Sequence, residues 1–73
     1  MTLADMKEND CGIISYISND CKIKRRLLDL GFIKGNEISF ERRNLFGSPI
    51  AFDVEGSVVA IRKNDAKNVG VVL

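Results

Sequence analysis

Residues 22–35 hold the one convincing helix signal in a sequence that otherwise predicts short strands. Ile23, Leu27 and Leu30 recur at i, i+4 and i+7, which places them in one apolar stripe on a helix. Leu28 widens this stripe, and charged residues fill most of the other positions. A short helix that is apolar on one side needs a surface to lie on. We therefore expect Leu27 and Leu30 to be buried where the helix meets the rest of the chain.

Both ends of this helix carry residues suited to capping. Asn19 and Asp20 precede it, and a short side chain with an oxygen atom can accept from the free amide groups of a first turn. Gly31 follows it and can adopt the left-handed conformation in which many helices end. Phe32 would then pack back on Leu27.

The other segments predict five short strands. Residues 11–17 are rich in β-branched and aromatic side chains. In residues 36–43, Ile38 and Phe40 alternate with polar residues, as in a strand that is buried on one side. The five expected strands span residues 11–17, 36–43, 50–55, 57–62 and 69–73.

The connections between these strands also have recognisable signals. Residues 44–49 form a loop with Gly47 and Pro49 as turn residues. Glu55 and Gly56 predict a tight hairpin, because glycine adopts the positive φ that such turns require. Residues 64–67 predict a single helical turn capped by Asn64 or Asp65.

Five strands and one helix in 73 residues favour one small domain built as a closed or nearly closed β-barrel. Closure would remove the unpaired strand edges that promote aggregation. The helix lies between the first and second strands in the sequence, so we expect it to cover an open end of the barrel.

The sequence contains no histidine, phosphate-binding loop or nucleophile elbow, so we expect a protein that is not an enzyme and has no catalytic residues. Cys11 and Cys21 do not have the spacing of a metal site. We expect them to be packing residues, and we expect neither a bound metal nor a cofactor. A weak iron contact through carboxylates remains as an alternative.

No apolar run approaches the ~20 residues that a transmembrane helix needs. The first eight residues lack the basic and apolar regions of a signal peptide. We therefore expect a cytoplasmic protein with reduced cysteines.

The charge is unevenly distributed, although the total is only +1. Residues 22–43 carry seven basic and three acidic side chains, which leaves a net −3 on the rest. Arg25 and Arg26 are the candidate contacts for an acidic partner protein, with a purely solvated helix face as the alternative. No aromatic residues interleave with the basic ones, which disfavours nucleic acid.

Leu45 and Phe46 are apolar residues in the middle of the predicted loop 44–49. One interpretation is that they fold back over the barrel as a lid. The other, which we favour, is that they form an exposed apolar tip, a feature that can mark a binding contact. Leu45 and Phe46 therefore join Arg25 and Arg26 as expected partner-binding residues.

Residues 25–35, which read Arg-Arg-Leu-Leu-Asp-Leu-Gly-Phe-Ile-Lys-Gly, resemble the signature of the ferrous iron transport protein A (FeoA) family. Residues 47–52, Gly56 and residues 60–66 resemble the rest of that family's pattern, and the likeness covers nearly the whole chain. Two positions depart from it. Ser48 stands where the family commonly has aspartate, and Lys34 where it commonly has proline.

This resemblance implies a mainly β, SH3-like barrel of about five strands with one short α-helix, spanning residues 1–73. It implies a small cytosolic accessory protein that binds and modulates the ferrous iron transporter FeoB, through the cytosolic portion of that transporter. The membrane is then reached only through the partner. Two alternatives remain: a domain related to iron-dependent transcriptional repressors, which contain a similar barrel, and a protein that binds ferrous iron directly.

Overall fold

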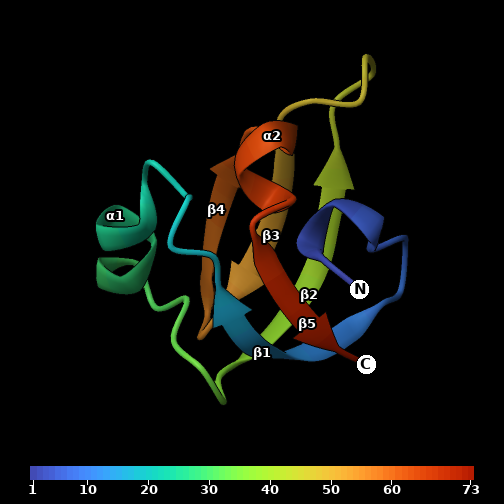
Figure 1. Cartoon of the computed structure of the whole chain (residues 1–73). Coiled ribbons are helices and arrows are strands. Elements are labelled where there is room, and N and C mark those ends of the chain that lie inside the picture. Colours follow the sequence, from blue (N-terminus) through green and yellow to red (C-terminus); the bar gives the residue numbers. More distant parts are fainter.

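The computed structural model describes residues 1–73 and contains one antiparallel sheet of five strands (Figure 1). The strands lie in the order β4-β3-β2-β1-β5. Their bounds are Cys11–Ile17 (β1), Glu37–Arg43 (β2), Ile50–Val54 (β3), Ser57–Ile61 (β4) and Val69–Val72 (β5). All five strands predicted from the sequence are confirmed, and their ends differ by at most one residue.

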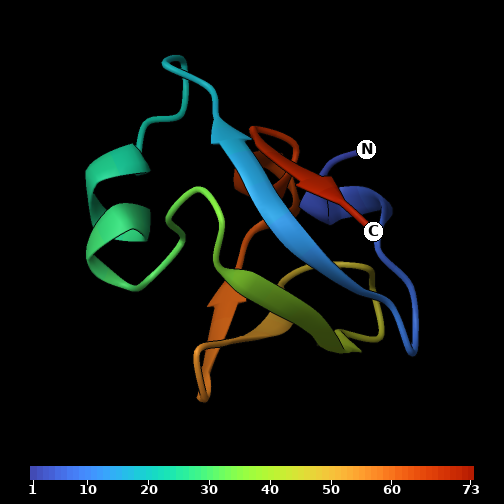
Figure 2. The ribbon, with the colours of Figure 1, turned by 90° about the horizontal axis from the view of Figure 1, so that it is seen from below.

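The sheet is curled but it is not closed by hydrogen bonds (Figure 2). Register shifts between Ile14 and Tyr16 in β1, and between Phe40 and Arg42 in β2, mark bulges. Bulges bend a strand and increase its twist. β4 and β5 are left as the two edges. The chain therefore forms a small barrel-like fold with a gap between β4 and β5, rather than a fully hydrogen-bonded barrel.

Three short helical segments accompany the sheet: η1 (Leu3–Asp5), α1 (Lys24–Asp29) and α2 (Lys63–Ala66). α2 connects the two edge strands, β4 and β5 (Figure 1). The start of the chain lies along β5, where Thr2 bridges Gly70 and the amide of Val71 donates to the carbonyl of Met1 at 2.9 Å. The β5 edge is thus partly covered.

The core lies inside the curl of the sheet. Phe40 and Phe52 meet edge to face, with ring centroids 6.3 Å apart, a favourable geometry for aromatic pairs. The N-terminal arm adds two fully buried side chains to this core, so its attachment to the sheet is apolar. The largest fully buried side chains are Phe32, Phe52, Leu3, Met6, Ile14, Leu27, Ile38, Ile50, Val54 and Val69.

The end of α1 agrees with the sequence prediction. Gly31 has a φ of 103°, its amide donates to the carbonyl of Leu28, and the amide of Phe32 donates to the carbonyl of Leu27. This pair of bonds is the Schellman motif. Leu27 and Phe32 are both fully buried, so the end of the helix is also its main attachment to the core.

The beginning of α1 and the burial of Leu30 differ from the prediction. The residue before the helix is Ile23, and no side chain caps the first turn. The side-chain oxygen of Asn19 instead accepts from the ammonium group of Lys24 at 2.7 Å. Leu30 is 38% exposed, because the helix ends at Asp29 and so buries only Leu27 fully. Asn19 and Asp20 as caps, and Leu30 as a core residue, were wrong predictions.

The two turns that flank β4 also differ in their detail. Glu55 and Gly56 both have positive φ, which confirms the predicted two-residue hairpin. α2, however, begins one residue earlier than expected, and neither Asn64 nor Asp65 caps it. The hydroxyl oxygen of Ser48 accepts from the amide of Lys63, the first residue of α2, at 3.1 Å. The cap therefore comes from a distant loop.

Candidate partner-binding surface

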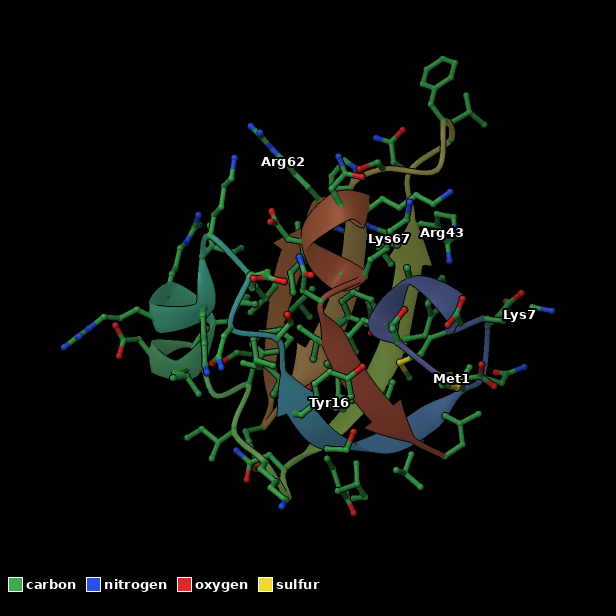
Figure 3. The ribbon with its side chains drawn as sticks, viewed as in Figure 1. Met1, Lys7, Tyr16, Arg43, Arg62 and Lys67 are labelled. Atoms are coloured by element: carbon green, nitrogen blue, oxygen red, sulfur yellow. The ribbon has the colours of Figure 1, made fainter.

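The loop between β2 and β3 projects from one end of the molecule, and its tip is apolar (Figures 1 and 3). Leu45 is 92% exposed and Phe46 is 90% exposed. Neither side chain folds back over the barrel, so the lid interpretation is excluded. We refer to Leu45 and Phe46 as the apolar tip.

Hydrogen bonds within the loop hold the apolar tip in place. The amide of Gly47 donates to the carbonyl of Asn44 at 2.8 Å, and the amide of Phe46 donates to the side chain of Asn44 at 3.0 Å. The amide of Asn44 in turn donates to the carbonyl of Pro49. Gly47 has a φ of 88°, a conformation that glycine adopts easily. The two side chains are thus presented by an ordered turn, which lowers the entropy that binding would remove.

Arg25 and Arg26 are exposed on α1, as expected. Arg26 and Leu30 face β4 across a groove of about 200 Å³, whose other side includes Val59 and Arg62. α1 and the loop 44–49 lie on different sides of the molecule in both ribbon views (Figures 1 and 2). The four predicted residues therefore lie at two separate places on the surface, not in one continuous patch. Arg25 and Arg26 make up the first place, and the apolar tip is the second.

Basic residues that the sequence analysis did not single out lie between these two places. Arg62, Lys63 and Lys67 are exposed at α2, and Figure 3 shows Arg62 at the same end as the loop tip. The bond from Lys63 to Ser48 ties α2 directly to the loop that carries the tip. These three residues lie outside residues 22–43, the segment with the basic excess. The net charge of a segment does not show which other segments fold next to it, so the sequence did not place them near the tip.

Arg43 has a structural role. Its guanidinium group donates to the carbonyl oxygens of Met6, Ala4 and Gly47 at 3.0–3.4 Å. It also lies 5.7 Å from the ring centre of Phe40, within the range of a cation–π contact. Arg43 therefore ties the N-terminal arm and the loop to β2.

The opposite end of the sheet is acidic. A groove of about 520 Å³ runs across it, and Glu37, Asp53 and Glu55 line this groove together with Ile13 and Val72. β3 begins at the loop that carries the apolar tip and ends at the hairpin that contains Glu55. The molecule is thus basic around the tip and acidic at the far end of β3.

Cys11 is exposed and Cys21 is buried, and both thiols are free. Nowhere do three Cys, Asp or Glu side chains gather closely enough to hold a metal ion. The pKa of the Asp5 carboxyl group is lowered by a hydrogen bond from the amide of Thr2 at 2.9 Å. None of the helices has the length and apolar character needed to cross a membrane.

The fold resembles that of proteins with a different role. A manganese-dependent transcriptional repressor complexed with manganese superposes with a TM-score of 0.87 at 22% identity, and the match covers 99% of this chain and 35% of the repressor chain. At this identity the likeness shows the fold alone.

Closer sequence relatives share both the fold and most of the length. The solution structure of the FeoA protein from Chlorobium tepidum superposes with a TM-score of 0.92 at 27% identity, covering 100% of this chain and 70% of that one. The crystal structure of Stenotrophomonas maltophilia FeoA with zinc, described as a procaryotic SH3 domain protein, gives a TM-score of 0.87 at 29% identity, covering 99% and 89%.

A curated protein of Campylobacter jejuni, the putative Fe(2+) transport protein A, is 32% identical over 73 residues, covering 100% of this chain and 99% of that protein. The family model of the FeoA domain matches residues 1–73. Sequence, length and fold agree, and the chain belongs to the FeoA family of ferrous iron transport proteins, with an SH3-like fold.

Proposed function

We propose that this protein is a non-enzymatic, cytoplasmic accessory of ferrous iron uptake that binds the cytosolic portion of a FeoB-type transporter and modulates it. Residues 1–73 act as one domain in this proposal. The observation that carries it is the apolar tip, where Phe46 is 90% exposed on a hydrogen-bonded turn. Membership in a ferrous iron transport family supports the choice of partner.

The two predicted places would make different contributions to binding. Arg25 and Arg26 would attract an acidic face of the transporter and orient the approach, since complementary charge acts mainly on association. Leu45 and Phe46 would supply buried apolar area, since aromatic anchors carry much of the energy of an interface. The exposed basic residues of α2 would extend the attraction between the two places.

The proposal is tested by measuring equilibrium binding to the purified cytosolic portion of a FeoB-type transporter. The double variant Arg25→Glu with Arg26→Glu, and separately Phe46→Ala, should each raise the Kd at least tenfold. A tenfold change corresponds to a loss of about 1.4 kcal/mol in binding free energy. Lys7→Glu with Lys34→Glu is the matched control for charge, and Val58→Ala, at a residue 52% exposed on β4, is the control for apolar loss. Wild-type affinity in both test variants would overturn the proposed surface.

Direct binding of ferrous iron is the competing function that this experiment does not address. The zinc in the S. maltophilia structure belongs to that protein. Equilibrium dialysis of this chain with ferrous iron separates the two functions. Under our proposal, iron should not be retained at micromolar concentrations, and its presence should not be required for binding to the transporter.

A further inference from the structure

We propose that the end of the molecule carrying Leu45 and Phe46 also binds an anionic lipid surface directly, with the apolar tip inserted among the lipid headgroups. This goes beyond the proposed function, because it needs no transporter. It also revises the expectation that the membrane is reached only through the partner.

The shape of the tip favours a lipid surface. Leu45 and Phe46 lie in the loop between β2 and β3, which projects from the molecule (Figure 1), and they are 92% and 90% exposed. Two large apolar side chains on a convex tip can enter a bilayer without a matching cavity, whereas a protein partner must supply a pocket for them. The turn closed by Asn44 and Gly47 keeps both side chains pointing outward before contact.

The charge around the tip favours an anionic surface. The two segments that form this end, residues 41–49 and 62–68, carry five basic and two acidic side chains. Lys63 and Lys67 are both exposed, and the amide of Lys67, the C-cap residue of α2, donates to the carbonyl of Lys63, so the two residues lie one helical turn apart. Each basic group near an anionic leaflet raises binding by about fivefold, and salt weakens this effect.

The acidic end gives the molecule an orientation. Glu37, Asp53 and Glu55 surround the groove at the opposite end of β3 from the tip. A negative surface would repel that end and attract the basic one, so the tip should meet the lipid first. Leu45 and Phe46 cannot be buried in the lipid and in the transporter interface at the same time. If the proposed function holds, the lipid contact is a reversible first step that brings the protein to the surface where a membrane partner lies.

The test uses fluorescence, because the chain contains no tryptophan. Phe46→Trp places the single indole at the tip, and Tyr16→Trp places it on β1, away from the loop that carries the tip, as a control (Figure 3). Vesicles of phosphatidylcholine with phosphatidylglycerol should shift the emission of Phe46→Trp to the blue, and brominated lipid should quench it. Tyr16→Trp should change in neither respect, and vesicles of phosphatidylcholine alone should bind much more weakly.

Vesicle co-sedimentation provides a second measurement on proteins without tryptophan. Phe46→Ala should lower the partition coefficient by about tenfold to a hundredfold, because this is the change in equilibrium constant expected when one buried phenylalanine ring is lost. Lys63→Glu with Lys67→Glu should lower it by tenfold or more, whereas Lys7→Glu with Lys34→Glu should change it less. Unshifted emission of Phe46→Trp, or equal sedimentation of wild type and Phe46→Ala, overturns the lipid contact. Binding to the transporter portion in solution, measured separately, would leave the proposed function standing.

Discussion

The hydroxyl oxygen of Ser48 accepts a hydrogen bond from the backbone amide of Lys63, 3.1 Å away and fifteen positions later in the chain. This bond joins the loop 44–49 to the first turn of α2, which has no side-chain cap of its own. An aspartate carboxylate at this position would accept the same bond and would also be favoured by the positive end of a helix.

Replacing this hydroxyl should therefore lower stability. Ser48→Ala should reduce the free energy of unfolding by about 1 kcal/mol, the usual effect of losing a helix cap, and Ser48→Asp should not reduce it. Denaturant unfolding measures both, with Ser57→Ala, at an exposed strand position, as the control. Equal stability of Ser48→Ala and wild type would show that the bond contributes nothing.

The N-terminal caps of the two α-helices were the least predictable feature of the fold. Caps were predicted at Asn19, Asp20, Asn64 and Asp65, but Asn19 and Asp20 lie before the N-cap residue Ile23 of α1, and Asn64 and Asp65 lie inside α2. Side-chain oxygens next to a helix are good candidates only when nothing else reaches the amide groups. At α2, the tertiary fold brings Ser48 to that position, and no local pattern records such a contact.

Leu27 and Leu30 should differ sharply in their contribution to stability. Leu27 is 1% exposed and Leu30 is 38% exposed. Leu27→Ala should reduce the free energy of unfolding by about 2–5 kcal/mol, because it leaves a cavity in the core. Leu30→Ala should reduce it by less than about 1 kcal/mol. Urea unfolding of the two variants checks this difference, and equal losses would mean that α1 is packed through both residues.

Periodicity predicted the elements well and the burial within α1 less well. Alternation in a strand separates two faces, and Ile50, Phe52 and Val54, which alternate along β3, are all buried. A helix of only six residues makes fewer than two turns. A stripe at i, i+4 and i+7 therefore extends beyond it, which is why Ile23 is only partly buried and Leu30 is exposed.

Gly31→Ala should destabilise the protein through the backbone alone. Gly31 has a φ of 103°, and a methyl group there would meet only Val54, at an ordinary 3.7 Å. The loss should be about 1–2 kcal/mol, the penalty for a left-handed residue with a Cβ atom. Gly31→Asn should lose less, since asparagine tolerates this region better. Thermal unfolding of both variants tests the order, and a fully stable alanine variant would contradict it.

Tyr16 and Gly70 are partners across β1 and β5, and the tyrosine ring lies against the glycine backbone. A methyl group at position 70 would overlap this ring, so Gly70→Ala should destabilise the fold by about 1–3 kcal/mol. Tyr16 is 54% exposed, and its removal eliminates the two nearest contacts of the added methyl group, leaving the hydroxyl oxygen of Ser15 at 2.8 Å. A double-mutant cycle should therefore show that Gly70→Ala has a smaller effect in a Tyr16→Ala background. If the effects of the two substitutions on the free energy of unfolding were strictly additive, the tyrosine ring would move away from the methyl group without a loss of stability.

Only some of the candidate binding residues could be predicted from the sequence. The exposed, apolar character of Leu45 and Phe46 followed from their place in a loop bounded by strands. The basic residues of α2 did not, because they lie 16 to 21 positions after Phe46 and outside residues 22–43, the segment whose basic excess suggested a binding role. Only the fold shows that Arg62 faces the same groove as Arg26.

The separation of α1 from the apolar tip leads to a kinetic prediction for docking on the transporter. Arg25→Glu with Arg26→Glu should slow association and reduce its dependence on salt, because these charges act before contact. Phe46→Ala should leave association nearly unchanged and raise the dissociation rate, by an amount worth about 2 kcal/mol if the ring is buried in the complex. Surface plasmon resonance at two salt concentrations resolves the two rates.

Both variants should remain folded in this experiment, since Arg25, Arg26 and Phe46 are all exposed. The control pair Lys7→Glu with Lys34→Glu changes the net charge equally, so it separates local attraction from the effect of total charge. If both variants altered the same rate constant, the tip and the helix would act as one contact. Because the two places lie on different sides of the molecule, independent effects on the two rates are the expected result.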